Sequence, residues 1–166
     1  MKKNLIILYI AGAILLGGLF AFFSGGGKNG IKPSEYSQGA LVAAETEFDF
    51  GTIPMEGGDV SHRFQLKNEG EEPVLIEKVY TSCMCTIAEV FDKDGKNRGE
   101  FGMPGHGPQR TDISVGSKEP VFIDAVFDPA AHGPSGVGLA ERVIYIETNS
   151  QKSPKVELSF TATVTR

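Results

Sequence analysis

The chain has 166 residues, with 21 acidic and 16 basic side chains and a formal net charge of −5 at pH 7. This length suits one domain with a single core, and the acidic balance, without a stripe of Lys and Arg, argues against nucleic acid as a partner. Eleven Phe residues supply bulk for the core, while 21 Gly and 9 Pro are typical of short strands joined by turns.

An uncharged apolar run from Leu5 to Phe23 dominates the start of the chain. A helix over this run would span roughly 28 Å, close to the hydrocarbon thickness of a bilayer. Lys2 and Lys3 precede it, which favours a cytoplasmic N-terminus and a C-terminal domain outside the cytoplasm, periplasmic or extracellular. The exit at 21–25 lacks the Ala-x-Ala pattern of a cleaved signal peptide. Residues 1–23 are therefore predicted to form a single-pass anchor, with a cleaved signal segment as the alternative.

Residues 24–40 are predicted to form a flexible linker. Gly25-Gly26-Gly27 resists helix formation because glycine loses the most backbone entropy on folding, and Pro33 interrupts the second half of the segment. A flexible chain of this length spans roughly 20–25 Å on average. The domain after the linker would lie close to the membrane and turn freely.

From residue 41 to 166, apolar and polar side chains alternate as in half-buried strands. In the clearest strand, Val156, Leu158, Phe160, Ala162 and Val164 share the inward face. No convincing amphipathic helix interrupts the pattern. About seven short strands with turns between them indicate an all-β, immunoglobulin-like antiparallel β-sandwich. The predicted strands include Val42–Phe50, Val60–Lys67, Val74–Tyr80, Pro120–Asp128, Arg142–Thr148 and Val156–Val164.

The stretch Asp92–Lys118 differs from its surroundings. It is rich in Gly, Pro and charged residues and has little periodicity, apart from Asp94-Gly95, which could close a small hairpin. Long irregular loops are unusual in compact domains and are often functional. This stretch is predicted to be an irregular insertion.

Short motifs succeed one another in a fixed order: Asp49–Ile53, Val60–Phe64, Asn68–Gly70, Thr81–Thr86, Val126–Pro129 and Ile146–Asn149. This order resembles the bacterial domain-of-unknown-function 1573 family, over roughly residues 45–164. The resemblance implies an immunoglobulin-like sandwich similar to major-sperm-protein and cilium-associated domains, commonly placed after a signal or anchor segment. It implies no defined activity. Two features depart from the family pattern: Met84 stands where Gly is usual, and the stretch 92–118 is longer than usual.

Cys83 and Cys85 are the two cysteines of the chain. In a regular strand, residues two apart lie on one face about 6.6 Å from each other, whereas a disulfide needs Cβ atoms about 3.5–4.5 Å apart. A bond between them therefore requires a sharp local bend. Three interpretations stay open: two packed apolar side chains, a soft-metal site for copper or zinc, and a redox pair or strained disulfide.

A metal site at Cys83 and Cys85 would need further ligands from elsewhere in the chain. His106 and Met103 lie in a Gly- and Pro-rich loop suited to soft-metal ligands, and His62 lies on an inward strand face. His132 and Met55 are further candidates. Each histidine also has a plain structural interpretation, and His62 in particular is predicted to be a satisfied core or edge residue.

No phosphate-binding loop, zinc-protease motif, nucleophile elbow or complete calcium loop occurs in the sequence. The leading hypothesis is a membrane-tethered, extracytoplasmic, non-catalytic module that binds a protein or envelope partner, without a cofactor. A sheet edge and the stretch 92–118 are the expected surfaces. The alternative is a periplasmic copper- or zinc-binding or thiol-redox accessory protein that uses Cys83 and Cys85.

Overall fold

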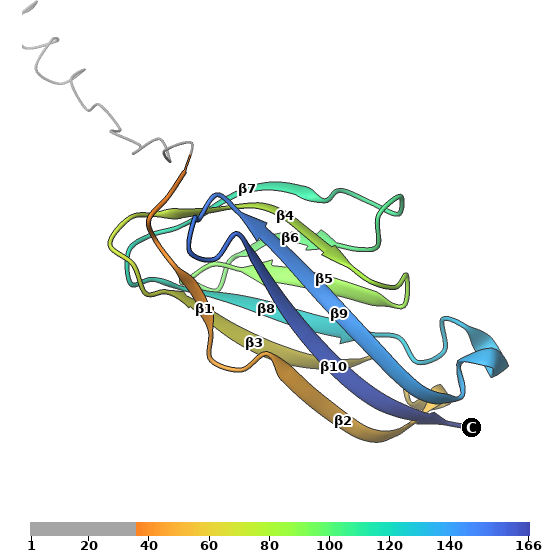
Figure 1. Ribbon diagram of the computed structural model, residues 1–166. Helices are drawn as coiled ribbons and strands as arrows, with labels where there is room; N and C mark the ends of the chain where they lie inside the picture. Colours follow the sequence, from red (N-terminus) through yellow and green to blue (C-terminus); the bar gives the residue numbers. More distant parts are fainter. Residues whose placement is uncertain (1–35) are drawn as a thin grey trace, which may run out of the picture. The chain divides into compact units, whose positions relative to one another are not determined.

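The computed structural model describes residues 36–166, which form ten β-strands and two short 3-10 helices arranged as two five-stranded sheets (Figure 1). The predicted all-β sandwich is confirmed. The predicted anchor at 5–23 lies outside the described residues, as does most of the predicted linker. Within the described range, neither helix has the length and apolar composition needed to cross a bilayer.

The first sheet is antiparallel throughout. Its spatial order is β1 (Leu41–Ala43), β3 (Val60–Asn68), β8 (Pro120–Phe127), β5 (Thr86–Phe91) and β6 (Asn97–Phe101).

The second sheet is mixed. Its order is β2 (Glu47–Pro54), β10 (Lys155–Thr165), β9 (Gly138–Thr148), β4 (Val74–Thr81) and β7 (Arg110–Val115). Because β2 runs parallel to β10, the prediction of a purely antiparallel sandwich is wrong at this pair. The 3-10 helices are η1 (Met55–Gly57) and η2 (Gly133–Gly136).

The core lies between the sheets and shows the predicted alternation. In β10, Leu158, Phe160, Ala162 and Val164 are buried, and the same rhythm holds in β3 and β8. Phe127 of one sheet meets Phe160 of the other, with ring centroids 5.4 Å apart. Burial of such rings supplies much of the free energy that holds two sheets together.

The first predicted strand is in fact two strands in different sheets. Ala44 donates its backbone N–H to Gln65 of β3, while the carbonyl oxygen of Thr46 accepts a hydrogen bond from Ser159 of β10. The backbone therefore changes partner within three residues. Residue alternation alone does not reveal this switch, because β1 and β2 are both extended, which is one reason why the strand count exceeds seven.

The stretch Asp92–Lys118 is not irregular throughout, because it contains β6 and β7. Both are edge strands, with one neighbour each in the described structure. An edge strand needs apolar side chains only where it faces the core, and here those are Phe101, Ile113 and Val115. The remaining positions are polar, which explains why the sequence shows little periodicity.

The packed structure begins before residue 41. Ser37 is buried and donates its N–H to the carbonyl oxygen of Asn149 at 2.9 Å. A Cβ atom at Gly39 would collide with the carbonyl oxygen of Glu72. The predicted linker, residues 24–40, therefore extends several residues too far toward the C-terminus. Small side chains let the end of this segment pack closely against the sandwich.

Asn68 closes this end of the sandwich. Its side chain is fully buried at the end of β3. The amide nitrogen donates to the carbonyl oxygens of Glu72 at 2.8 Å and Val115 at 3.1 Å, and Oδ1 accepts from the N–H groups of Ala40 and Gly70. One side chain thus joins the N-terminal segment to two loops, as expected of a buried amide with satisfied polar atoms.

Candidate functional site

Cys83 and Cys85 lie in the turn that joins β4 to β5 and so crosses from one sheet to the other. Thr86 donates its N–H to the carbonyl oxygen of Cys83 at 3.2 Å, and Thr81 Oγ1 donates to the same oxygen at 2.9 Å. The regular-strand geometry assumed for the two cysteines is therefore wrong. The chain must reverse here to change sheets, which supplies the sharp bend.

A second crossover, from β8 to β9, meets this turn. Asp128 donates its N–H to the carbonyl oxygen of Cys85 at 2.9 Å. Ser82 and Val143 are joined twice: the Ser82 N–H donates to the Val143 carbonyl oxygen, and the Val143 N–H donates to Ser82 Oγ, both at 2.9 Å. These bonds hold the cysteine turn against both sheets.

His132 precedes η2 in the second crossover and completes a cluster with the cysteines. Its Nε2 atom lies 3.1 Å from Cys83 Sγ. The two sulfurs and one ring nitrogen of His132 all lie within 4.8 Å of one another. Cys85 is buried, Cys83 is half-buried and His132 is exposed, so the cluster begins in the core and opens to solvent. Two thiols and an imidazole are ligands that soft metals favour.

Arg142 adds a positive charge to the inner side of the cluster. It pairs with Phe160 across β9 and β10 and therefore lies on the inward face. Its Nε–H donates to Cys85 Sγ at 2.9 Å, and its guanidinium lies 5.8 Å from the Phe127 ring centroid. Sequence reasoning missed this residue. The sequence does contain a signal for Arg142. Because side chains alternate along a strand, Arg142 shares the inward face of β9 with the buried Ile144, two residues later.

The two thiols titrate differently. Burial opposes ionisation of Cys83, but its hydrogen bonds with Cys85 and His132 and the charge of Arg142 outweigh burial and lower its pKa from 9.0 to about 7. Burial, helped by the hydrogen bond with Cys83, raises the pKa of Cys85 despite the bond from Arg142. A thiol that ionises near neutral pH at an exposed turn is both a nucleophile and a metal ligand.

The histidine predicted to lie on an inward strand face is bound elsewhere. His62 Nε2 lies 2.7 Å from Glu45 Oε1, and the ring stacks on Phe48 with centroids 3.6 Å apart. The side chain is half-buried and has a partner in Glu45, as predicted for a satisfied histidine. His62 and His106 do not belong to the cluster around Cys83 and Cys85.

Met103 and His106 line a separate hollow of about 270 Å³ beside the cysteine turn. Met84 and Ile87 line the same hollow and are 54% and 41% exposed, respectively. Met84 is therefore an exposed apolar side chain of this hollow and is not one of the clustered ligand residues. The residue that separates the two cysteines contributes to an apolar surface next to β6.

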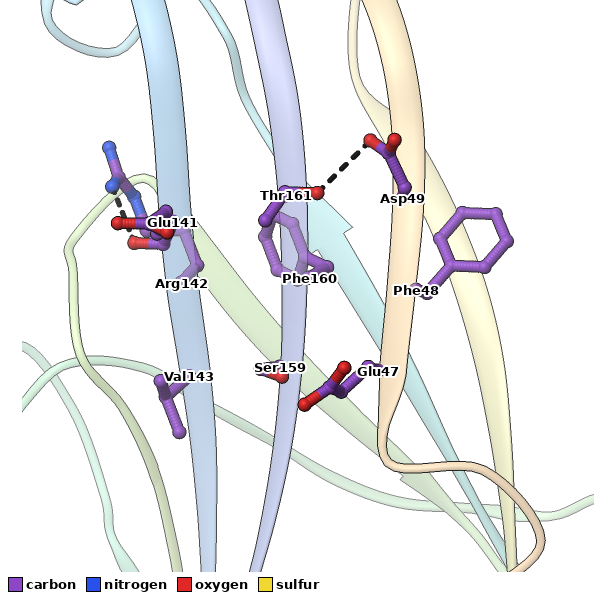
Figure 2. A pocket seen from close by; sticks show the side chains of 9 residues that line it. All are labelled: Glu47, Phe48, Asp49, Glu141, Arg142, Val143, Ser159, Phe160 and Thr161. Atoms are coloured by element: carbon purple, nitrogen blue, oxygen red, sulfur yellow. Dashed lines mark hydrogen bonds between the residues drawn. The ribbon is translucent and has the colours of Figure 1, made fainter.

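A larger, open hollow of about 640 Å³ lies over β2, β10 and β9. Figure 2 shows its side chains, among which Thr161 Oγ1 donates to Asp49 Oδ1 at 3.0 Å and Arg142 donates to the carbonyl oxygen of Glu141 at 2.8 Å. The first bond joins the neighbouring strands β10 and β2, and the second joins adjacent residues of β9. The hollow adjoins the cysteine cluster through Arg142.

Comparison with solved structures supports the fold. A protein of unknown function from Porphyromonas gingivalis W83 is 17% identical with a TM-score of 0.56, covering 81% of this chain and 51% of that chain. This chain therefore spans about half the length of that protein. Weaker likenesses include the VesB protease of Vibrio cholerae (10% identity, TM-score 0.46, 78% of this chain and 32% of that chain). Another is PapD-like domain 7 of human CEP192 (16% identity, TM-score 0.44, 84% of this chain and 92% of that chain).

No curated protein matches the sequence. A family model described as "Protein of unknown function (DUF1573)" matches residues 41–103. The matched segment runs from β1 to just after β6 and includes both cysteines and Met84 between them. The resemblance found in the sequence motifs is thereby confirmed over residues 41–103, where the chain is similar to the DUF1573 family.

Proposed function

We propose that the chain is a membrane-tethered, extracytoplasmic, immunoglobulin-like module that binds an extended segment of a partner protein, without catalysis. The binding surface is the edge strand β6 together with the hollow beside it. Within residues 36–166, β6 has β5 as its one neighbour, so the backbone groups along its other edge have no strand partner. Such an edge can accept a strand from another chain.

The hollow next to β6 is the observation that carries this proposal. It is lined by Met84 and Ile87, which are two of the six large hydrophobic side chains exposed in the described structure. Phe101, the last residue of β6, forms its inner wall. Main-chain pairing along β6 would supply affinity, and an apolar side chain of the partner placed in the hollow would supply specificity.

Flexible thioethers suit this role. Met84 and Met103 both line the hollow, and methionine adapts its shape to different apolar partners. The polar neighbours Glu100 and His106 lie at the same hollow and would orient the bound segment. The surface therefore favours a peptide with one large apolar side chain flanked by polar residues.

A display experiment tests the binding surface. The full-length chain in detergent is used to select short linear peptides from a random library, and binding is measured for the wild type and for Ile87→Glu. A charge at Ile87 should abolish binding, because it would be buried without a partner. Leu139→Glu is the matched control, since Leu139 is 70% exposed on β9 and away from the hollow.

Hydrogen exchange locates the bound peptide. Backbone amides of β6 should gain protection when the peptide binds, while those of β1, an edge strand at the opposite side of the same sheet, should not. Selected peptides that bind Ile87→Glu as well as the wild type, or that protect β1 instead, would refute the proposed surface.

The proposed location rests on the apolar run at 5–23 and the lysines before it. Alkaline phosphatase fused after Arg166 should be active, because that enzyme needs an oxidising compartment to form its disulfides. An inactive fusion that is present in normal amounts would place the C-terminal domain inside the cell.

A further inference from the structure

We propose that Cys83, Cys85 and His132 form a binding site for a single copper(I) ion. The site is distinct from the partner-binding surface and does not depend on it. Its three ligand atoms come from two separate inter-sheet crossovers that the fold brings together.

The spacing of the ligand atoms fits one ion. An ion bound by three ligands at about 2.0–2.3 Å has ligand atoms about 3.7–4.0 Å apart. The two sulfurs and the imidazole nitrogen lie within 4.8 Å of one another, and Cys83 Sγ lies 3.1 Å from His132 Nε2. Changes of less than about an ångström in these separations would place all three ligand atoms around one centre.

The charges of the ligands and of Arg142 favour a monovalent ion. Two thiolates and one copper(I) ion carry a net charge of −1, and the guanidinium of Arg142 lies against Cys85 Sγ at 2.9 Å. The two thiolates, the copper(I) ion and the guanidinium together carry no net charge. Because Cys85 is buried and Arg142 is half-buried, a net charge here would cost free energy. A zinc ion with the same two thiolates is already neutral, and Arg142 would leave an excess positive charge.

Coordination number leads to the same choice. Structural zinc sites are almost always four-coordinate. In residues 36–166, no fourth Cys, His, Asp or Glu ligand atom joins the three within 4.8 Å of one another. Soft thiolates bind both copper(I) and zinc, but three protein ligands complete a copper(I) site, whereas zinc would need a fourth ligand such as water.

The surroundings hold the ligands in place. The N–H of Cys85 donates to Cys83 Sγ at 3.4 Å, and the N–H of Asp128 fixes the carbonyl oxygen of Cys85. Outer contacts of this kind orient metal ligands and tune their donor strength. His132 and Cys83 form the accessible side, through which an ion can enter.

Anaerobic titration of the full-length chain in detergent tests the site. Copper(I) is added in competition with bicinchoninate, a coloured copper(I) chelator. The wild type should withdraw one copper ion per chain. Cys83→Ser and Cys85→Ser should abolish this competition, and His132→Ala should weaken it at least about 10-fold. Arg142→Gln should weaken copper(I) binding about 10- to 100-fold, the range for outer-shell residues, while Arg142→Lys should restore part of it.

His106→Ala is the matched control, because His106 is an exposed histidine outside the cluster, and it should bind copper(I) like the wild type. X-ray absorption of the wild-type copper complex should show two sulfur ligands and one nitrogen, a result that does not depend on how well any variant folds. A shell without sulfur, a four-sulfur shell shared between chains, or equal affinity of the wild type and Cys83→Ser would overturn the proposal.

Discussion

Arg142 donates its Nε–H to the sulfur of Cys85 at 2.9 Å from an inward position on β9. An arginine in this position is costly unless its charge and its N–H groups find partners. Here the partners are Cys85 Sγ, the carbonyl oxygen of Glu141 and the face of Phe127. The cationic side chain therefore belongs to the cysteine cluster, and it couples the ionisation of both thiols to the packing of the sandwich end.

The first prediction concerns the reactivity of Cys83 in metal-free protein. Because its pKa is lowered from 9.0 to about 7, its thiolate fraction rises through neutral pH. Alkylation by iodoacetamide, followed by mass spectrometry of the Cys83 peptide, should reach half its maximal rate near pH 7. Arg142→Gln should move this midpoint upward, whereas Arg98→Gln, a change of an arginine on β6, should not. A wild-type rate that still rises above pH 9 would contradict the lowered pKa.

The second prediction concerns Asn68, the buried amide that joins three segments. Asn68→Ala leaves the N–H groups of Ala40 and Gly70 and several carbonyl oxygens without their partner. The free energy of unfolding should fall by about 3 kcal/mol, since each unsatisfied buried group costs about 1–3 kcal/mol. Urea denaturation measures the change. Gln65→Ala, on the exposed face of the same strand, should lie within about 0.5 kcal/mol of the wild type.

The third prediction tests the contact between the sheets. Phe160 is almost fully buried and packs against Phe127 and Phe50. Phe160→Ala should lower the free energy of unfolding by about 3–5 kcal/mol, through lost burial and the cavity left behind. Leu139→Ala on the adjacent strand should have little effect because Leu139 is exposed. A loss below about 1 kcal/mol at Phe160 would mean that the sheets do not pack as described.

The fourth prediction concerns a pH-dependent surface contact. Glu147 accepts hydrogen bonds from Lys78 at 2.7 Å and Tyr80 at 3.0 Å. The bond from Lys78, against the opposing effect of burial, lowers the pKa of Glu147 below 4.5. A carboxylate with a lowered folded-state pKa stabilises the protein above its ordinary pKa, and this contribution is lost as pH falls through the lower value.

Glu147→Gln should therefore reduce stability at pH 7, by at most about 1 kcal/mol because the contact is partly exposed. The difference from the wild type should disappear on acidification below the ordinary carboxylate pKa. Thermal melts at several pH values measure it, with Glu77→Gln on the neighbouring strand β4 as the control. A difference that grows at low pH would show that the sign is wrong.

The residue pattern predicted the sandwich where burial is one-sided. In β10, Leu158, Phe160 and Ala162 alternate with polar residues because one face packs and the other is wet. It failed at β6 and β7, where the edge position relaxes the demand for apolar side chains, and at the switch between β1 and β2. These features depend on which strands become neighbours, and that is decided by contacts distant in sequence.

The cysteine pair was identifiable from the sequence, but its surroundings were not. His132 was one of three candidate histidines, and nothing local distinguished it from His106. It lies near Cys83 because the two crossovers end at the same side of the sandwich. Arg142 is a charged residue at an inward position of β9, which the alternation of that strand reveals. Its partner Cys85 is 57 residues away in the sequence, so only the fold shows the contact.

The N-terminal segment and the cysteine turn lie at opposite ends of β8. Lys67, next to Asn68, pairs with Pro120, whereas Thr86, just after Cys85, pairs with Phe127. Eight residues of strand separate these ends by roughly 25 Å (Figure 1). A protein that docks on the two sulfur atoms would therefore approach the sandwich from the end away from Ala40, which Asn68 holds at the other end.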